Sequence, residues 1–164
     1  METVKATEQH FPVIQEIARI TWYHTYSELL SPGQSEYMLE MMYSTEALKE
    51  QIYHKSHRYL LVKDGGEFIG YISYELNYEN SGKTKVQKIY VLPRYHGKGV
   101  GKLLIDEVEK IAKANSSCYL LLNMNKNNTA VHFYKKMGFR IVAEDCIDIG
   151  QGYVMDDYIL EKEI

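Results

Sequence analysis

The stretch IYVLPRYHGKGVGKLL, residues 89–104, decides the fold of this chain. An apolar run stops at Pro93, glycines follow at Gly97, Gly99 and Gly101, and a run with helical spacing comes next. Glycine lets the backbone turn through positive φ and bring its N–H groups close to a ligand. A helix N-terminus adds unpaired N–H donors and a partial positive charge. The stretch therefore predicts a strand, a phosphate-binding loop and a helix, with an ordinary glycine-rich turn as the alternative for the loop alone.

The spacing of the glycines distinguishes between kinds of phosphate-binding loop. A P-loop needs four residues between its glycines and a hydroxyl after the lysine, but three residues separate Gly97 from Gly101 and Leu103 follows Lys102. A dinucleotide-binding loop needs a third glycine where this chain has Lys102. The form R-x-x-G-x-G does occur, at residues 94–99. It resembles the acetyl-CoA signature of the GNAT (Gcn5-related) N-acetyltransferases.

A second segment, residues 127–139, resembles the GNAT form N-x-x-A-x-x-F-Y-x-x-x-G-F. The spacing selects Asn127 for the asparagine, and Asn128 is an alternative. Taken without the motif, Tyr134 would be a core tyrosine on an amphipathic helix. The resemblance covers residues 85–140. The segments TWYHTYSELLSP and IGQGYVMDDYILEK also look similar to bacterial polyamine N-acetyltransferases of the PaiA type.

The periodicity of the apolar residues predicts one α/β (α+β) domain over residues 1–164. The expected order is a strand, three helices, a hairpin, a strand, a helix, a strand, a helix and a last hairpin. The expected ranges are 3–6, helices from 7, 32 and 44, 57–64, 67–79, 84–92, a helix after the glycine loop, 116–124, 127–138, 139–149 and 153–163. This is the GNAT order. It implies a central, mostly antiparallel sheet of about seven strands with one parallel splayed pair and helices on both faces.

The resemblance implies direct attack of an amine on acetyl-CoA, without a protein nucleophile. Tyr134 is expected to protonate the CoA thiolate, because its hydroxyl has an ordinary pKa of about 10. Backbone groups on the strand at 84–92 are expected to bind the pantetheine arm, with the strand at 117–123 on the other side of it, and the loop to hold the pyrophosphate. The predicted cofactor-binding residues are Ile89, Tyr90, Val91, Arg94, His96, Gly97, Lys98, Gly99, Val100, Gly101, Lys102, Asn127, Asn128, Tyr134 and Lys136.

The general base is harder to assign from the sequence. The resemblance to the polyamine enzymes implies a glutamate two residues before Ile89, where this chain has Gln87, which does not serve as a base. Glu75, on the neighbouring predicted strand, is the expected substitute, acting through water. An exposed strand carboxylate is the alternative explanation for Glu75, and His24 is a third candidate base.

Composition and charge narrow the function further. Residues 1–79 carry 12 acids against six Lys or Arg, whereas residues 80–113, around the loop, carry three against eight. This distribution suits an anionic cofactor and a cationic acceptor, and it gives no reason to expect a nucleic acid. We expect transfer of acetyl to a small-molecule amine, a polyamine such as spermidine or spermine. The alternatives are acetylation of protein N-termini or lysines, and a non-catalytic CoA-binding sensor.

The sequence gives no sign of a membrane protein, a secreted protein or a metalloprotein. No apolar run approaches the roughly 20 residues of a membrane span, and the first residues lack the pattern of a secretory signal. Cys118 and Cys146 show no C-x-x-C spacing, which indicates a reduced cytoplasmic setting. The motifs require no metal. The sequence leaves open a homodimer and the identity of the amine.

Overall fold

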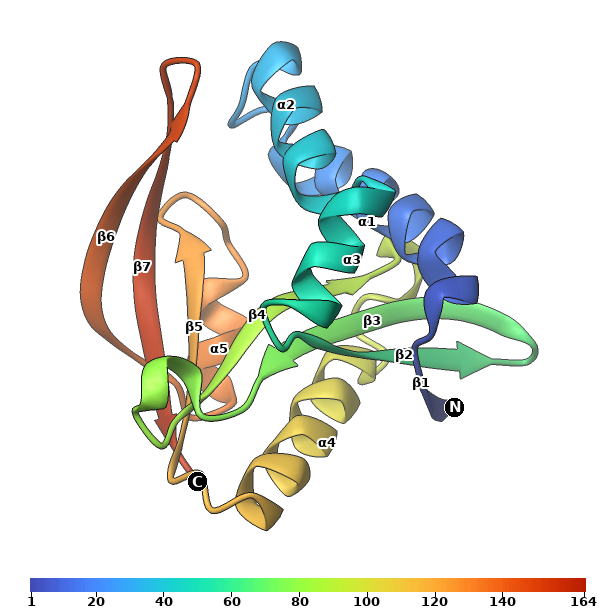
Figure 1. The fold of residues 1–164 in the computed structure, drawn as a ribbon, viewed down its shortest axis with the longest axis vertical. Helices are drawn as coiled ribbons and strands as arrows, with labels where there is room; N and C mark the ends of the chain where they lie inside the picture. Colours follow the sequence, from blue (N-terminus) through green and yellow to red (C-terminus); the bar gives the residue numbers. More distant parts are fainter. The chain divides into compact units, whose positions relative to one another are not determined.

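The computed structural model describes residues 1–164, and it has the order of elements that the sequence predicts (Figure 1). The strands are β1 (Glu2–Lys5), β2 (Arg58–Asp64), β3 (Glu67–Glu75), β4 (Thr84–Val91), β5 (Tyr119–Asn125), β6 (Arg140–Gly150) and β7 (Tyr153–Glu163). The helices are α1 (Phe11–Tyr26), α2 (Pro32–Tyr43), α3 (Thr45–Tyr53), α4 (Val100–Ala114) and α5 (Val131–Lys136). The strands form one sheet in the order β1-β2-β3-β4-β5-β7-β6, in which β4 and β5 are the parallel pair. The predicted fold class is confirmed.

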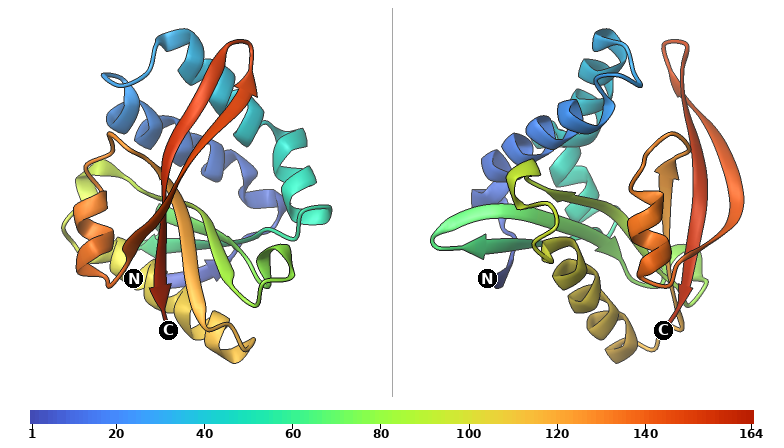
Figure 2. Two further views of the ribbon diagram at one scale, coloured as in Figure 1. Left: turned by 90° about the vertical axis from the view of Figure 1, so that its left-hand side faces the viewer. Right: turned by 180° about the vertical axis from the view of Figure 1, so that it is seen from behind.

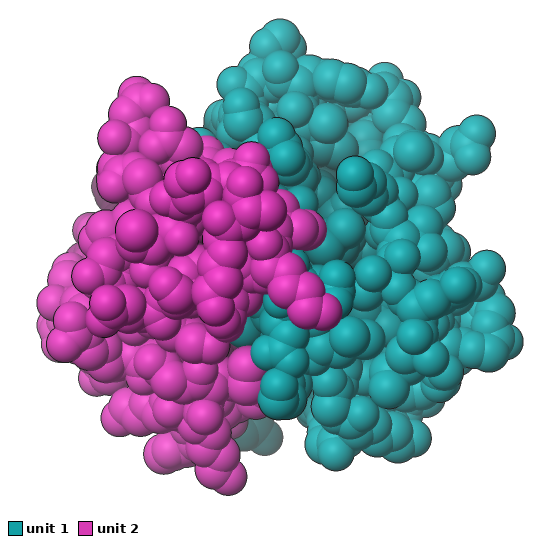
Figure 3. All heavy atoms as spheres, turned by 90° about the horizontal axis from the view of Figure 1, so that it is seen from below, with its two compact units in different colours: residues 1–75, 87–108 teal, residues 76–86, 109–164 magenta.

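The chain divides into two compact units, residues 1–75 with 87–108 and residues 76–86 with 109–164 (Figure 3). Both β4 and α4 contribute residues to each unit. The single domain over residues 1–164 stays a prediction.

In the first unit, β1, β2 and β3 form an antiparallel sheet, and α1, α2 and α3 lie on one side of it (Figures 1 and 2). The first half of α4 lies on the other side. Gly65 and Gly66 make the β2–β3 turn, both with positive φ, as their sequence predicted. The residues predicted to form the buried face of α1 are all at most 3% exposed: Phe11, Ile14, Ile17, Ala18 and Trp22.

The starts of α2 and α3 follow from capping serines. The Ser31 Oγ accepts a hydrogen bond from the Gln34 N–H at 3.1 Å, and the Ser44 Oγ accepts one from the Ala47 N–H at 3.1 Å. The sequence spacing predicts Tyr37, Met38, Met41 and Met42 on the apolar face of α2, which was partly wrong, because Met41 is 39% exposed. The buried residues of α2 are instead Ser35, Met38, Leu39 and Tyr43, spaced as one face of a helix.

In the second unit, the first residues of β4 pair in parallel with β5, from Thr84 opposite Leu120 to Val86 opposite Leu122. Strand β7 pairs antiparallel with both β5 and β6. The near-continuous apolar run at residues 116–124 predicts a strand buried on both faces, and this was wrong: Leu120, Leu122 and Met124 of β5 are buried, whereas the alternate residues are half-buried. The other face carries polar residues, among them the Lys83–Glu161 ion pair at 2.6 Å.

The remaining parts of the second unit match their sequence signals. Gly138 follows α5 with φ +95°, which explains the end of this helix. The turn between β6 and β7 consists of Gly150, Gln151 and Gly152, all with positive φ, and these two strands are the longest of the sheet (Figure 2).

Candidate functional site

The glycine loop of the first unit has the backbone that the sequence predicts. Gly97 and Gly99 have φ of +74° and +81°, a region that disfavours other residues, and a Cβ added at either would meet no atom within 4 Å. Helix α4 begins at Val100, and the Leu103 N–H donates to the Gly99 carbonyl at 2.9 Å. The N–H groups before Leu103 therefore form the donor end of the helix. Gly101 has no positive φ and lies in the first turn of α4.

The three cations expected at the pyrophosphate differ in their partners. Arg94 forms an ion pair with Glu67 of β3, and the Lys102 Nζ contacts the Asp106 Oδ2 at 2.5 Å. Lys98 is exposed on the loop, and its Nζ lies 4.9 Å from the Tyr95 ring centroid rather than against a carboxylate. Of these cations, Lys98 is therefore the most readily available to an anion.

His96 ties the loop to the end of β4. Its Nε2 lies 2.9 Å from the Val91 carbonyl oxygen, which can only accept, so the ring carries a proton on Nε2. The Leu92 N–H donates to the Ile69 carbonyl at 2.9 Å, and Gly70 allows β4 to approach β3 closely, because a Cβ there would lie 2.7 Å from the Tyr90 oxygen. The end of the segment predicted to bind the pantetheine arm is thus held by His96 and by β3.

Glu75 lies in a cluster of polar side chains in the first unit. Gln87 Nε2 donates to the Glu75 Oε2 at 3.1 Å, and His57 Nε2 lies 3.8 Å from the same oxygen. The side chains of Glu75 and His57 are 21% and 10% exposed, so Glu75 is not a fully solvated strand carboxylate. The sequence analysis missed His57. A bulge between Val62 and Lys63 shifts the β2–β3 register by one residue, so that Arg58 pairs with Tyr74 and His57, one residue further, lies opposite Glu75. Counting from the two-residue turn alone would have placed His57 opposite Tyr74.

Lys88 is a second polar group that the sequence analysis missed. Its Nζ donates to the Gln51 Oε1 at 2.6 Å and to the Tyr59 hydroxyl at 3.2 Å, and it lies 4.9 Å from the Tyr43 ring centroid. Burial, with a smaller contribution from Lys55, lowers the pKa of Lys88 to about 7. Its donors are engaged, so the side chain ties β4 to α3 and β2.

In the second unit, Tyr134 lies on α5 and is 7% exposed. Its ring is edge-on to Phe133 and Phe139, with centroids 5.1 and 5.7 Å away. The Asn128 Oδ1 accepts from the Ala130 N–H at 2.9 Å at the start of the helix. Lys136 is exposed in the last turn of α5. The motif residues thus shape the helix, and their roles toward the cofactor stay predictions.

Asp157 on β7 is the third group that the sequence analysis missed. It is 3% exposed, and no hydrogen bond to its carboxylate contributes to its pKa. Burial, together with Asp145 and Asp156, raises its pKa to about 6, against a smaller lowering by Lys85 and Lys126.

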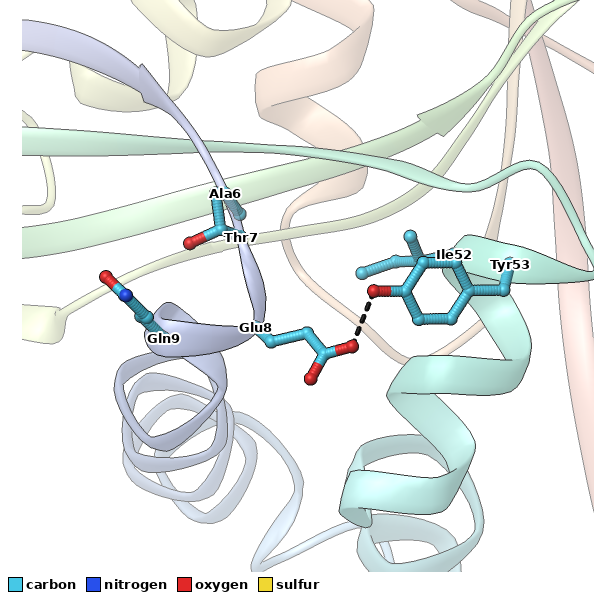
Figure 4. A pocket seen from close by; sticks show the side chains of 6 residues that line it. All are labelled: Ala6, Thr7, Glu8, Gln9, Ile52 and Tyr53. Carbon is cyan, nitrogen blue, oxygen red and sulfur yellow. Dashed lines mark hydrogen bonds between the residues drawn. The ribbon is translucent and has the colours of Figure 1, made fainter.

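A hollow of about 550 Å³ also lies in the first unit, lined by Ala6, Thr7, Glu8, Gln9, Ile52 and Tyr53. The Tyr53 hydroxyl donates to the Glu8 carboxylate at 2.5 Å across it (Figure 4). None of the predicted site residues lines this hollow. No group of three or more His, Cys, Asp or Glu side chains could hold a metal ion. No helix is long and apolar enough to cross a membrane.

Comparison with known proteins agrees with both sequence motifs. The model of the Acetyltransferase (GNAT) family matches residues 20–139, which include the glycine loop and the Tyr134 segment. The chain belongs to the GNAT acetyltransferase family. This membership confirms the predicted family, and the protein is an N-acetyltransferase that uses acetyl-CoA as its cosubstrate.

Several relatives of this GNAT protein are informative. A spermidine N(1)-acetyltransferase of Thermoplasma acidophilum is 28% identical over 99% of this chain and 97% of the relative. The crystal structure of the PaiA N-acetyltransferase of T. acidophilum in complex with coenzyme A has a TM-score of 0.83 at 27% identity, covering 99% of this chain and 98% of that one. A peptidyl-lysine N-acetyltransferase of Salmonella typhimurium is 36% identical, but over only 40% of this chain and 43% of the relative.

Proposed function

We propose that this GNAT enzyme transfers the acetyl group of acetyl-CoA to a primary amine of a polyamine, such as spermidine or spermine. The observation that carries the proposal is the likeness to a spermidine N(1)-acetyltransferase over 99% of the chain. The excess of acids in residues 1–79 supports a cationic acceptor. Acetylation of protein N-termini or lysines is the second candidate, supported by the shorter match to a peptidyl-lysine acetyltransferase.

On the cofactor side, the proposal assigns the pyrophosphate to the donor end of α4 and the residues before it. The positive φ of Gly97 and Gly99 and the exposed Lys98 support this assignment. Backbone groups of Ile89, Tyr90 and Val91 bind the pantetheine arm. The remaining proposed contacts come from Arg94, His96, Val100, Gly101, Lys102, Asn127, Asn128, Tyr134 and Lys136.

The reaction needs a neutral amine, a stabilised carbonyl oxygen and a proton for the leaving thiolate. The Val91 N–H would stabilise the developing oxyanion, a contribution on the order of 3 kcal/mol for an aimed donor. The Tyr134 hydroxyl would give its proton to the CoA thiolate as it leaves and regain a proton from solvent, because a phenol is the weaker acid and holds its proton at neutral pH. The amine nitrogen forms a bond to the acetyl carbon as the C–S bond breaks, and the proton that the acylated nitrogen then releases passes to solvent.

We propose that Glu75 takes the proton of the acceptor ammonium through a water molecule. Its contact with Gln87 supports this role, because the donated hydrogen bond orients the carboxylate and leaves its other oxygen for water. His57 Nε2 lies 3.8 Å from the Glu75 Oε2, a distance that allows an ion pair when the ring is protonated but no hydrogen bond. His24, the third candidate, is exposed on α1, with its ring 5.7 Å from that of His96.

Thiol release with a panel of amines tests the proposal. Turnover with spermidine and spermine above that with N-terminal and lysine peptides supports it. Preference for a peptide would favour the second candidate, and release with neither would favour the CoA-binding sensor. The cytoplasmic setting and the homodimer stay predictions.

A further inference from the structure

One face of the β5–β7–β6 sheet gathers residues that the cofactor side does not use. Across an antiparallel pair, opposed residues point to the same face. Asn125 and Asp145 both oppose Asp157, and Asn123 opposes Ile159. We call this surface, formed by Asn123, Asn125, Asp145, Met155, Asp157 and Ile159, the Asp157 face.

Some of the acids near this face form an ion pair with a lysine, and Asp157 does not. Lys126 Nζ contacts the carboxylates of Glu144 and Asp156 at 2.9 Å each. Asp157 takes no part in these ion pairs, because it lies on the other face of β7 from Asp156. Lys85 Nζ donates to the Tyr78 hydroxyl at 3.2 Å. Asp157 is a buried carboxylate that Lys85 and Lys126 influence only through space, without a hydrogen bond to it.

Such a group is costly unless a cation reaches it. Burial of an anion without hydrogen bonds or an ion pair destabilises a fold, and protein interiors rarely keep one. The charges around Asp157 do not remove this cost, because Asp145 and Asp156 oppose the help from Lys85 and Lys126. The half-buried Asn125 and Asp145 flank it and leave this face partly open. The site therefore suits a cationic ligand that binds without a metal.

Apolar and aromatic side chains lie on either side of Asp157 along β7. Tyr153, Met155 and Ile159 alternate along β7 on the side of Asp157 and are half-buried, whereas Val154 and Asp156, on the other side, are exposed. Methylene groups pack on such side chains while an ammonium group meets the carboxylate. This pairing of charge and apolar surface matches an alkyl chain that carries more than one ammonium group.

We propose that Asp157 binds a non-reacting ammonium group of the acceptor and so selects polyamines over monoamines. The inference rests on the proposed function and deepens it. Asp157 forms no bond to the acetyl group and exchanges no proton in this role. It acts as a specificity-determining residue of the acceptor site.

The test compares three acceptors at saturating acetyl-CoA: spermidine, 1,7-diaminoheptane and n-heptylamine. The last two have the same carbon chain and differ by one ammonium group. Thiol release gives kcat and KM for the wild type, for Asp157→Asn and for Asp156→Asn, a matched control at the next residue on the exposed face. Asp157→Ser repeats the test if the asparagine variant does not fold. Calorimetric binding of CoA and thermal unfolding show that each variant is intact.

We expect the wild type to prefer the diamine and spermidine over heptylamine by at least about tenfold in kcat/KM. Asp157→Asn should remove this preference, mainly through KM, while heptylamine changes less than about threefold. Asp156→Asn should behave as the wild type. Equal losses with all three amines, or no loss, would overturn the inference alone. A wild type that turns over peptides and none of these amines would overturn the proposed function, and the polyamine role of Asp157 with it.

Discussion

Gln87 Nε2 donates a hydrogen bond to the Glu75 Oε2 at 3.1 Å. Gln87 stands where the polyamine enzymes lead us to expect a glutamate base, and Glu75 is the residue predicted to act as the base in its place. An amide cannot act as a base, but it orients the carboxylate beside it. His57, 3.8 Å from the same oxygen, completes a three-residue group on β3, β4 and the residue before β2. This arrangement makes Glu75 the carboxylate to test first.

Glu75→Gln should lower kcat/KM for the amine by about 100-fold, because the amide keeps the shape of the side chain and loses the proton acceptor. Binding of acetyl-CoA should not change. Initial rates of thiol release and calorimetry measure the two effects. Glu79→Gln, at an exposed acid of the next loop, is the control. Full activity of Glu75→Gln would assign the base elsewhere.

Tyr134→Phe should lower kcat at least about tenfold with little change in CoA affinity, since only the proton for the thiolate is lost. The ring contacts with Phe133 and Phe139 remain, so the fold should be intact. Tyr119→Phe, on the half-buried face of β5, is the control. An unchanged kcat would mean that solvent protonates the thiolate and that Tyr134 has a packing role.

Gly99→Glu should abolish CoA binding, because it places a carboxylate at the donor end of α4 and forces a side chain into φ +81°. Gly82→Glu is a matched control, since Gly82 has φ +71° and equally open surroundings in another loop. Both variants should lose similar stability, and calorimetry should show CoA binding only in the control. Binding that survives in Gly99→Glu contradicts the proposed pyrophosphate site.

Asp157 should make the fold less stable as the pH rises. Its pKa is about 6 in the folded chain and 3.8 when unperturbed, so between these values the folded state binds more protons than the unfolded state. The free energy of unfolding should therefore fall as the pH rises from about 4 to 6, by on the order of 2 kcal/mol. Asp157→Asn should lessen this fall and be more stable at pH 7.5. Urea unfolding at pH 4.5 and 7.5 measures it, and a less stable Asp157→Asn at pH 7.5 would contradict the prediction.

The sequence predicted what depends on local pattern. The positive φ of Gly97, Gly99 and Gly138, and the cap at Ser31, follow from residue type and spacing. The sequence did not reveal Asp157, because its burial and its like-charged neighbours depend on how three strands pair. Met41 was placed on the wrong face of α2 for a related reason: an apolar side chain has no single burial state without its partners.

The contacts of Lys88 also could not be predicted from the sequence. Its neighbours Ile89 and Tyr90 were recognised from the motif, but the contacts of Lys88 with Gln51 and Tyr59 come from elements far away in the sequence. A charged residue in a predicted strand is expected to be exposed to solvent unless the face of the sheet on which it lies is known. Register counted from the β2–β3 turn would have paired His57 with Tyr74, because nothing in the sequence reveals the bulge between Val62 and Lys63 that brings His57 opposite Glu75.

The most direct test of the central claim is kcat/KM for spermidine compared with N-terminal and lysine peptides at two salt concentrations. A cationic acceptor held by carboxylates should give a higher value with spermidine, and its KM should rise with salt because exposed charges are screened. Acetyl-CoA binding, held by backbone donors, should change less. Peptides that outperform spermidine, or an acceptor KM that ignores salt, would contradict the polyamine assignment.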